Sequence, residues 1–295
     1  MITGADPQLT WNLVADVRQA LNFPFMVNAF RAGGVVAVLA GTVGWFMVLR
    51  RQSFAGHTLA VVSFPGAAAA VLVGVGSVYG LFAFAVVAAL VIALVPAAVG
   101  RGYSEAAAVT GTVQAMALAS GVLLVSVSGR NLNGVNALLF GSFLGITAQR
   151  VTVLVVVAVA VLAVVALIGR PLFFASVDPA VAATRGVPVR VLSVGFLVLL
   201  GVAAAAASQI TGSLLVFTLL VVPAATAQLL CANPRTSLLL TVLLGVGLTW
   251  GSLLVAYYVD VPLGFLLSSA AFMVYVLVAG ATRAAVMLGR RRVRV

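Results

Sequence analysis

Long apolar runs broken by short polar segments dominate the chain. The stretches 52–100 and 191–234 carry no charged residue, and each is long enough for two membrane crossings, because one crossing needs about 20 apolar residues. The runs and their flanking charges predict nine candidate spans, at 27–49, 57–75, 78–99, 106–128, 151–169, 191–207, 213–230, 237–258 and 262–282. Glycine-rich stretches also suit broken or re-entrant helices, so the expected range is about 8 to 10. The sequence therefore predicts an all-α, polytopic integral membrane protein.

Composition supports the same class. Hydrophobic residues make up 64% of the chain, charged residues 7%, and the mean hydropathy is +1.27. A soluble domain of this size has too little interior to hide that much apolar surface.

The charges indicate the orientation. The net charge is +11, and all sixteen basic residues are arginines at the ends of apolar runs, which is typical of the positive-inside pattern rather than of a nucleic-acid surface. With the N-terminus extracytoplasmic, twelve arginines fall inside and four outside. We therefore expect a multi-pass protein of the cell (plasma or inner) membrane, with its C-terminus in the cytoplasm.

These patterns divide the chain into three parts. An extracytoplasmic or interfacial segment is predicted at 1–24, a transmembrane domain at 25–282 and a basic cytoplasmic tail at 283–295. Apolar residues at Leu9, Leu13, Val17 and Leu21 favour an amphipathic interfacial helix, with a frayed terminus as the alternative. The uncharged but polar segment 131–149 suits either a short re-entrant helix or a packed loop.

One polar loop, 178–190, stands out between the spans. Asp178 and Pro179 suit the N-cap and first position of a helix, Gly186 suits its end, and Pro188 prevents its continuation. The loop therefore predicts a short cytoplasmic helix at 178–187.

Few residues within the spans can carry chemistry. His57, the only histidine, lies at the start of the second span, where it is either a metal ligand or a side chain bonded to a nearby carbonyl. Pro65 and Pro223 lie within spans and suggest either hinges or static kinks.

No enzyme motif is apparent. The chain has no Walker phosphate loop, no His-Glu-x-x-His zinc motif and no Ser–His pair at readable spacing. We expect no catalytic residue and no bound cofactor, so that any ATP is hydrolysed on a separate subunit.

Three ordered blocks resemble a known family. They lie at 23–66, 139–142 and 178–227, and include Gly56-His57, Phe64-Pro65-Gly66, Leu139-Phe140-Gly141-Ser142, Asp178-Pro179 and Val222-Pro223-Ala224-Ala225. The set resembles the membrane-spanning subunits of ATP-binding-cassette importers for zinc, manganese and iron, the family often called ABC-3. The resemblance covers roughly residues 23 to 282.

The resemblance implies partners and roles. It implies a homodimer with a pathway along its axis, two cytoplasmic ATPase subunits and an extracytoplasmic metal-binding protein. The loop helix would then dock on the ATPase and couple its closure to the spans, through Asp178, Pro179, Ala183, Arg185 and Gly186. Independently of the resemblance, Pro65 and Pro223 are the candidate gating or hinge positions.

The chain departs from the family pattern at one place. An acidic residue and, four residues later, a histidine are expected, but this chain has His57 and Val61. Two His57 residues across a dimer axis would still make a neutral pathway site, which suits zinc or copper better than manganese. For the importer as a whole, zinc or manganese is the expected cargo. A metal chelate, which brings its own ligands, is the alternative cargo. A gradient-driven secondary transporter is a further alternative, although the spans lack mid-membrane carboxylates.

Overall fold

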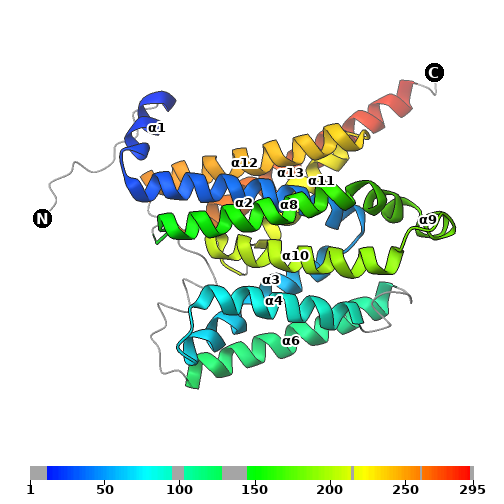
Figure 1. Cartoon of the computed structure of the whole chain (residues 1–295). Helices are drawn as coiled ribbons and strands as arrows, with labels where there is room; N and C mark the ends of the chain where they lie inside the picture. The colour runs from blue at the N-terminus through cyan, green and yellow to red at the C-terminus, as the bar shows by residue number, and fades with distance from the viewer. Residues whose placement is uncertain (1–11, 95–102, 128–144, 214–215, 260, 293–295) are drawn as a thin grey trace, which may run out of the picture.

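The computed structural model describes residues 12–94, 103–127, 145–213, 216–259 and 261–292. Throughout these ranges the regular secondary structure is helical (Figure 1). The helices are α1 (Leu13–Leu21), α2 (Pro24–Leu49), α3 (Ser53–Leu72), α4 (Ser77–Leu94), α6 (Tyr103–Val127), α8 (Ala148–Val177), α9 (Pro179–Thr184), α10 (Val189–Thr211), α11 (Val216–Leu230), α12 (Pro234–Tyr258) and α13 (Leu263–Arg292).

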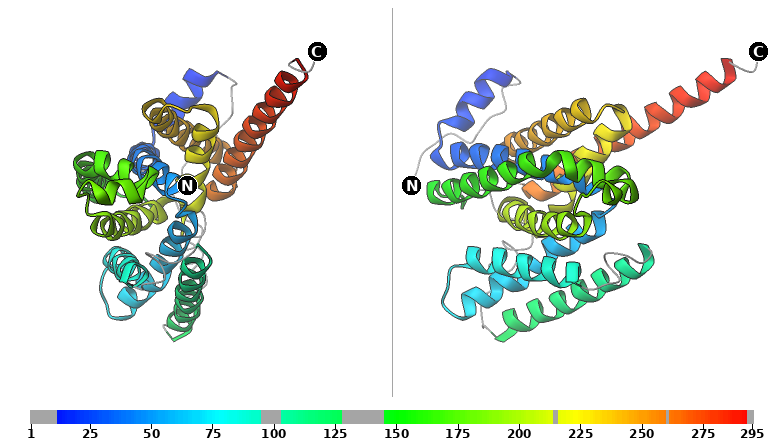
Figure 2. Two further views of the ribbon diagram at one scale, coloured as in Figure 1. Left: turned by 90° about the vertical axis from the view of Figure 1, so that its right-hand side faces the viewer. Right: turned by 45° about the vertical axis from the view of Figure 1, so that its right-hand side comes forward.

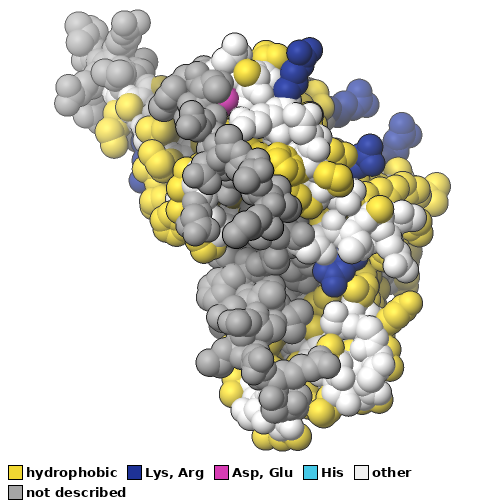
Figure 3. All heavy atoms as spheres, turned by 90° about the vertical axis from the view of Figure 1, so that its left-hand side faces the viewer, with side chains coloured by type: hydrophobic (Ala, Val, Ile, Leu, Met, Phe, Trp, Pro, Cys, Tyr) yellow, Lys and Arg dark blue, Asp and Glu magenta, His cyan; other side chains and the backbone are white. Residues whose placement is uncertain are grey.

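The long helices confirm the predicted class. Within the described residues, 8 helices are long and apolar enough to cross a membrane, and α11 is a shorter apolar helix. The prediction of an all-α protein with about 8 to 10 spans is therefore confirmed. In the space-filling view of the end that carries α1, hydrophobic side chains line much of the molecule's edge, as expected for a surface that faces lipid (Figure 3).

Two helices differ in length from the predicted spans. α8 has 30 residues and continues past Arg170 and Pro171, whereas the predicted span stopped at 169. α11 has 15 residues, about 22 Å of helix, which is less than the roughly 30 Å of a bilayer core. The turn before α11 contains Gly212, whose φ is +77°. Gly212 and Ser213 are buried, so the described part of this turn lies inside the bundle rather than at its surface.

α2 forms the centre of the bundle. It packs against α8, α10, α11 and α12, and it contributes the fully buried Met26, Leu39 and Met47 to the core (Figure 2). In places the backbones nearly touch: a Cβ at Gly44 would overlap the carbonyl group of Leu220 on α11. Small residues allow such close approach, on which association between membrane helices depends.

A second close approach joins α3 to α4. A Cβ added at Gly80 would overlap the carbonyl oxygen of Gly66, and a Cβ at Gly66 would overlap that of Gly80. Gly66 and Gly80 thus allow α3 and α4 to pack closely.

α1 lies against the last turn of α12 (Figure 1). Asn12 caps its first turn by accepting from the N–H groups of Val14 and Ala15. The Tyr258 hydroxyl donates to the Asp16 carbonyl oxygen at 2.9 Å and lies 3.2 Å from Gln19 Oε1. A helix is therefore present over the described part of the predicted amphipathic segment, and Leu9 lies outside the described residues. The side chain of Asp16 is buried, although the sequence pattern placed it away from the apolar line.

The two ends of the bundle differ in charge. α9 and the end of α13 lie at one end, which we call the α9 end, and α1 lies at the other (Figure 1). Following each helix from its first residue assigns the arginines whose side chains are described to ends: Arg18, Arg31 and Arg150 to the α1 end, and to the α9 end Arg50, Arg51, Arg170, Arg185, Arg190, Arg235 and Arg283. The proposed re-entrant segment lies mostly outside the described residues; its last part forms the N-cap of α8 at Thr147.

Candidate functional site

His57 lies in the first turns of α3 and faces α11. Its ring is half-buried and meets the Phe217 ring edge-on, with centroids 5.4 Å apart. Its Nδ1 atom is buried and has no hydrogen-bond partner among the described residues. The alternative that His57 is bonded to a nearby carbonyl through this nitrogen is therefore not what the structure contains.

The neighbouring contact shows how deep this site lies. The Thr58 hydroxyl donates to Gln114 Oε1 at 3.0 Å. Gln114 is close to the middle of α6, so Thr58 and His57 lie level with the middle of a membrane-spanning helix rather than at its end. Polar groups at this depth are expensive in lipid and are typical of a pathway or a polar packing site.

The surroundings of His57 hold no complete metal site. Among the described residues, no group of three or more His, Cys, Asp or Glu side chains could hold a metal ion. Val61, one turn further along α3, is 1% exposed and contributes no donor atom. One chain therefore offers a single imidazole here, which holds a metal only with help from a second copy, from water or from ligands on the cargo.

Pro65 and Pro223 lie on the two helices that meet at His57 and Phe217. Pro65 is inside α3 and Pro223 inside α11, and both are buried. Each removes one backbone N–H from its helix, which favours a bend. Their role as hinges stays a prediction.

α9 is a short helix with a complete cap at each end. At its start Asp178 accepts from the Val181 N–H at 3.0 Å, and Pro179 occupies the first position. At its end Gly186 has a φ of +78°, its N–H donates to the Ala183 carbonyl oxygen, and the Val187 N–H donates to that of Ala182. This pattern is a Schellman motif, in which a left-handed residue closes the helix.

α9 presents most of its surface outward. Ala182 is fully buried against the bundle, and the other side chains from 178 to 186 are exposed. The helix lies at the tip of the molecule, beyond the ends of the long helices (Figure 1). The five predicted coupling residues, Asp178, Pro179, Ala183, Arg185 and Gly186, all lie in this accessible helix or in its caps.

Arg50 holds the helices on both sides of α9. Its Nη1 donates to Ser176 Oγ at the end of α8 at 3.0 Å, and its Nη2 donates to Ser193 Oγ at the start of α10 at 2.7 Å. The guanidinium lies 5.4 Å from the centre of the Phe196 ring. Burial lowers the pKa of Arg50 from its ordinary value, but an arginine stays charged at neutral pH.

The family model for the ABC 3 transport family matches residues 22–281. The chain belongs to this family. Its place there agrees with the membrane bundle and the protruding α9, and identifies the chain as a permease of the ATP-binding-cassette class rather than a secondary transporter.

Individual relatives of this ABC permease are similar over most of their length. The manganese import system permease protein ScaB of Streptococcus parasanguinis is 29% identical over 252 residues, covering 85% of this chain and 89% of that protein. The manganese transport system membrane protein MntC of Halalkalibacterium halodurans is 29% identical, with 80% of each chain covered. A chain of PsaBC from Streptococcus pneumoniae, solved in complex with a Fab, has a TM-score of 0.80 at 25% identity and covers 90% of this permease and 95% of itself.

Sequence reasoning missed three residues of the site. Arg50 was counted only as an interior charge, although it organises the α9 end. Gln114 and Phe217 were not singled out, and their role follows from contacts between helices far apart in the sequence. A glutamine in the middle of an apolar span was a signal that could have found Gln114.

Proposed function

We propose that the chain is the translocating subunit of an ATP-driven importer for a transition metal ion. Two copies form the pathway along their shared axis, separate ATPase subunits supply the energy, and an extracytoplasmic binding protein delivers the metal. The observation that carries the proposal is the accessible, fully capped α9 at one end of a bundle of the ABC 3 transport family.

The relatives support a metal as cargo. ScaB and MntC carry manganese in their names, and both are similar along most of the chain. Manganese is therefore the first ion to test and zinc the second, because an imidazole ligand suits zinc while carboxylates suit manganese.

Charge supports the cytoplasmic side. The α9 end holds most of the described arginines, and short arginine-rich loops remain in the cytoplasm. The membrane is then the cell membrane, the N-terminus is extracytoplasmic and the C-terminus is cytoplasmic, where the ATPase is.

The geometry of α9 supports its role in coupling. The six residues of α9, capped at both ends, form a short rigid helix with small side chains on its surface. Such a helix suits a cleft in a partner protein. Arg50 of α2 forms hydrogen bonds to the helices before and after α9. A displacement of α9 by a partner would therefore move α2, α8 and α10 together.

We place His57 in the pathway of this importer. Its free Nδ1 lies at mid-bundle depth, and the buried prolines of α3 and α11 allow the two helices beside it to bend. Two copies would bring two imidazoles to the axis, a neutral and weak site that releases its ion readily.

A second cargo, a metal chelate, is favoured by one observation. No described residue near His57 forms a three-ligand group, so the protein supplies too few donors to strip an ion of its water. A chelate arrives with its ligands in place and needs only a polar, partly aromatic passage.

Metal uptake with His57→Ala separates these cargoes. Cells that express the wild-type chain with its partner subunits should accumulate Mn²⁺, and the variant should accumulate it at most about one tenth as fast at equal membrane levels, equivalent to about 1.4 kcal/mol. Ser120→Ala is the matched control, because that hydroxyl on α6 is bonded within its own helix and should leave uptake unchanged.

Each other outcome has a clear meaning. If the His57→Ala variant takes up free Mn²⁺ at the wild-type rate, His57 is not part of the pathway. If the cells take up a chelated metal but no free ion, and His57→Ala does not change that uptake, the cargo is a metal chelate. Failure to accumulate manganese or zinc in either form would contradict the importer proposal.

A further inference from the structure

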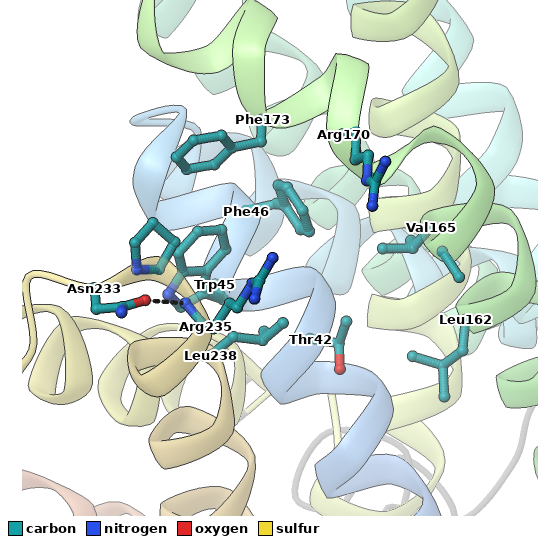
Figure 4. Close-up of a pocket in the computed structure, with 13 residues that line it drawn as sticks. Thr42, Trp45, Phe46, Leu162, Val165, Arg170, Phe173, Asn233, Arg235 and Leu238 are labelled. Atoms are coloured by element: carbon teal, nitrogen blue, oxygen red, sulfur yellow. Dashed lines mark hydrogen bonds between the residues drawn. The ribbon is translucent and has the colours of Figure 1, made fainter.

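An open cleft of about 630 Å³ lies between α2, α8 and α12. Trp45 and Phe46 of α2 form its floor, Leu162 and Phe173 of α8 one wall, and Leu238 of α12 the other (Figure 4). Arg170 and Arg235 extend into it from opposite walls, and Figure 4 shows both guanidinium groups over the same opening. The cleft thus combines a long apolar lining with two positive charges at the α9 end.

The neutral polar groups of the lining are already bonded. Thr42 donates to the Val38 carbonyl oxygen, Trp45 Nε1 donates to Ser237 Oγ, and Asn233 Oδ1 accepts from the Arg235 backbone N–H. The guanidinium groups of Arg170 and Arg235, in contrast, make no hydrogen bond or ion pair with any other described residue. The two guanidinium groups are therefore the charged groups of the cleft that have no partner among the described residues.

The surface around the cleft faces lipid. Leu167 beside it on α8 is 81% exposed, and Leu239 and Leu243 on α12 are 60% and 59% exposed. Large apolar side chains exposed on spanning helices contact acyl chains. Arg170 and Arg235 are exposed at the same rim, and arginines at the cytoplasmic surface of a membrane attract anionic headgroups.

We propose that this cleft binds an anionic phospholipid of the cytoplasmic leaflet. The phosphate lies between Arg170 and Arg235, and one acyl chain lies along Phe46, Leu162 and Leu238. Guanidinium groups bind phosphate oxygens through paired, charge-assisted hydrogen bonds, and basic pockets between membrane helices on the cytoplasmic side suit such headgroups. The leaflet rests on the orientation proposed above; the lipid site itself does not depend on transport.

The position of the cleft favours lipid over a second copy of the chain. α3, which carries His57, packs against α4, α6, α10 and α11. Residues of α8 and α12 form the walls of the cleft, and these two helices lie on another side of the bundle (Figure 2). A dimer that places His57 near its axis leaves the cleft on its outer, lipid-facing side.

Native mass spectrometry of the purified chain tests the proposal. The probes are palmitoyl-oleoyl phosphatidylglycerol and phosphatidylcholine with the same acyl chains, added without metal or ATP. The wild type should retain phosphatidylglycerol preferentially, and Arg170→Gln with Arg235→Gln should weaken it about 30-fold, since one arginine near an anionic headgroup contributes about fivefold. Arg150→Gln, at the other end of α8, is the matched control and should bind as the wild type does.

Ala166→Trp tests the cleft apart from its charge. Ala166 of α8 also lines the cleft, so tryptophan at this position fills the apolar part while both arginines remain. The variant should therefore also release phosphatidylglycerol. Retention of phosphatidylglycerol by Ala166→Trp would mean that the lipid is held by surface charge alone, and would overturn the proposed site.

Equal binding of both lipids by the wild type, or unchanged binding by the double arginine variant, would overturn the proposed site as well. A dimer that Ala166→Trp disrupts while lipid retention persists would identify the cleft as a contact between copies. Because the readout is lipid retention, its failure is distinguishable from a failure of metal uptake.

Discussion

Arg50 connects three membrane helices through one side chain. It is half-buried at the end of α2, and its partners are the hydroxyls of Ser176 and Ser193 and, at 3.4 Å, the carboxamide of Gln52. Hydrogen bonds to a charged group contribute about 1.5–3 kcal/mol each when they replace contacts with water. Two such bonds in a planar fork fix the separation of α8 and α10 and, with it, the base of α9.

We expect Arg50→Gln to destabilise the chain by about 2 kcal/mol, because glutamine cannot reach both serines. The melting temperature of the purified protein should fall by roughly 4–8 °C, on the scale of soluble domains of similar size. Arg50→Lys keeps the charge without the fork and should recover only part of the loss. Arg51, exposed and adjacent, supplies the control: Arg51→Gln should melt as the wild type does. Equal melting of the Arg50 and Arg51 variants would show that the serine contacts contribute nothing.

At the scale of single residues, features that depend on neighbours in the sequence could be predicted, and features that depend on distant contacts could not. The caps at Asp178 and Gly186 were predictable, because a cap depends on a few consecutive residues. The role of Arg50 was not, since Ser176 and Ser193 are 126 and 143 positions away. His57 was found as a candidate from its chemistry, but its depth became known only through the contact of Thr58 with Gln114.

Among the elements, α9 is the one whose shape can be altered without disturbing the bundle. Asp178→Arg removes the cap and reverses its charge, at a cost of about 1 kcal/mol in a helix that is almost wholly exposed. The chain should therefore reach the membrane at normal levels while metal uptake falls at least about tenfold.

Asp178→Asn separates the cap from the charge, because asparagine caps a helix as well as aspartate does. Substantial uptake by this variant would assign the effect to helix geometry, and loss of uptake would assign it to the carboxylate. Gln149→Arg adds a positive charge at the exposed opposite end of α8 and should transport normally. Normal uptake by Asp178→Arg would refute the docking role of α9.

The elements also show what hydropathy can and cannot predict. Each predicted span has a helix, because a run of apolar residues in lipid must satisfy its own backbone. The extension of α8 past Pro171 and the short α11 were missed, since both depend on neighbours: α8 is held by Arg50, and the start of α11 meets His57. Hydropathy measures how much apolar chain is present and says little about the depth at which a helix begins.

At the scale of the whole molecule, charge and position agree. The protruding α9, most of the described arginines and the cleft arginines lie at one end, and the His57 site lies between the ends. This arrangement suits the proposed partner surface on one side of the membrane and the proposed passage within it. Because the proposed importer works with partner subunits, its cargo is best measured in the cell.

The most direct measurement is the metal content of cells that lack this chain, by multi-element mass spectrometry. We expect a selective fall in one transition metal, manganese first and zinc second, that the wild-type chain restores and Asp178→Arg does not. Unchanged levels of every metal, with the cells starved of each in turn, would contradict the assignment of this chain to metal import.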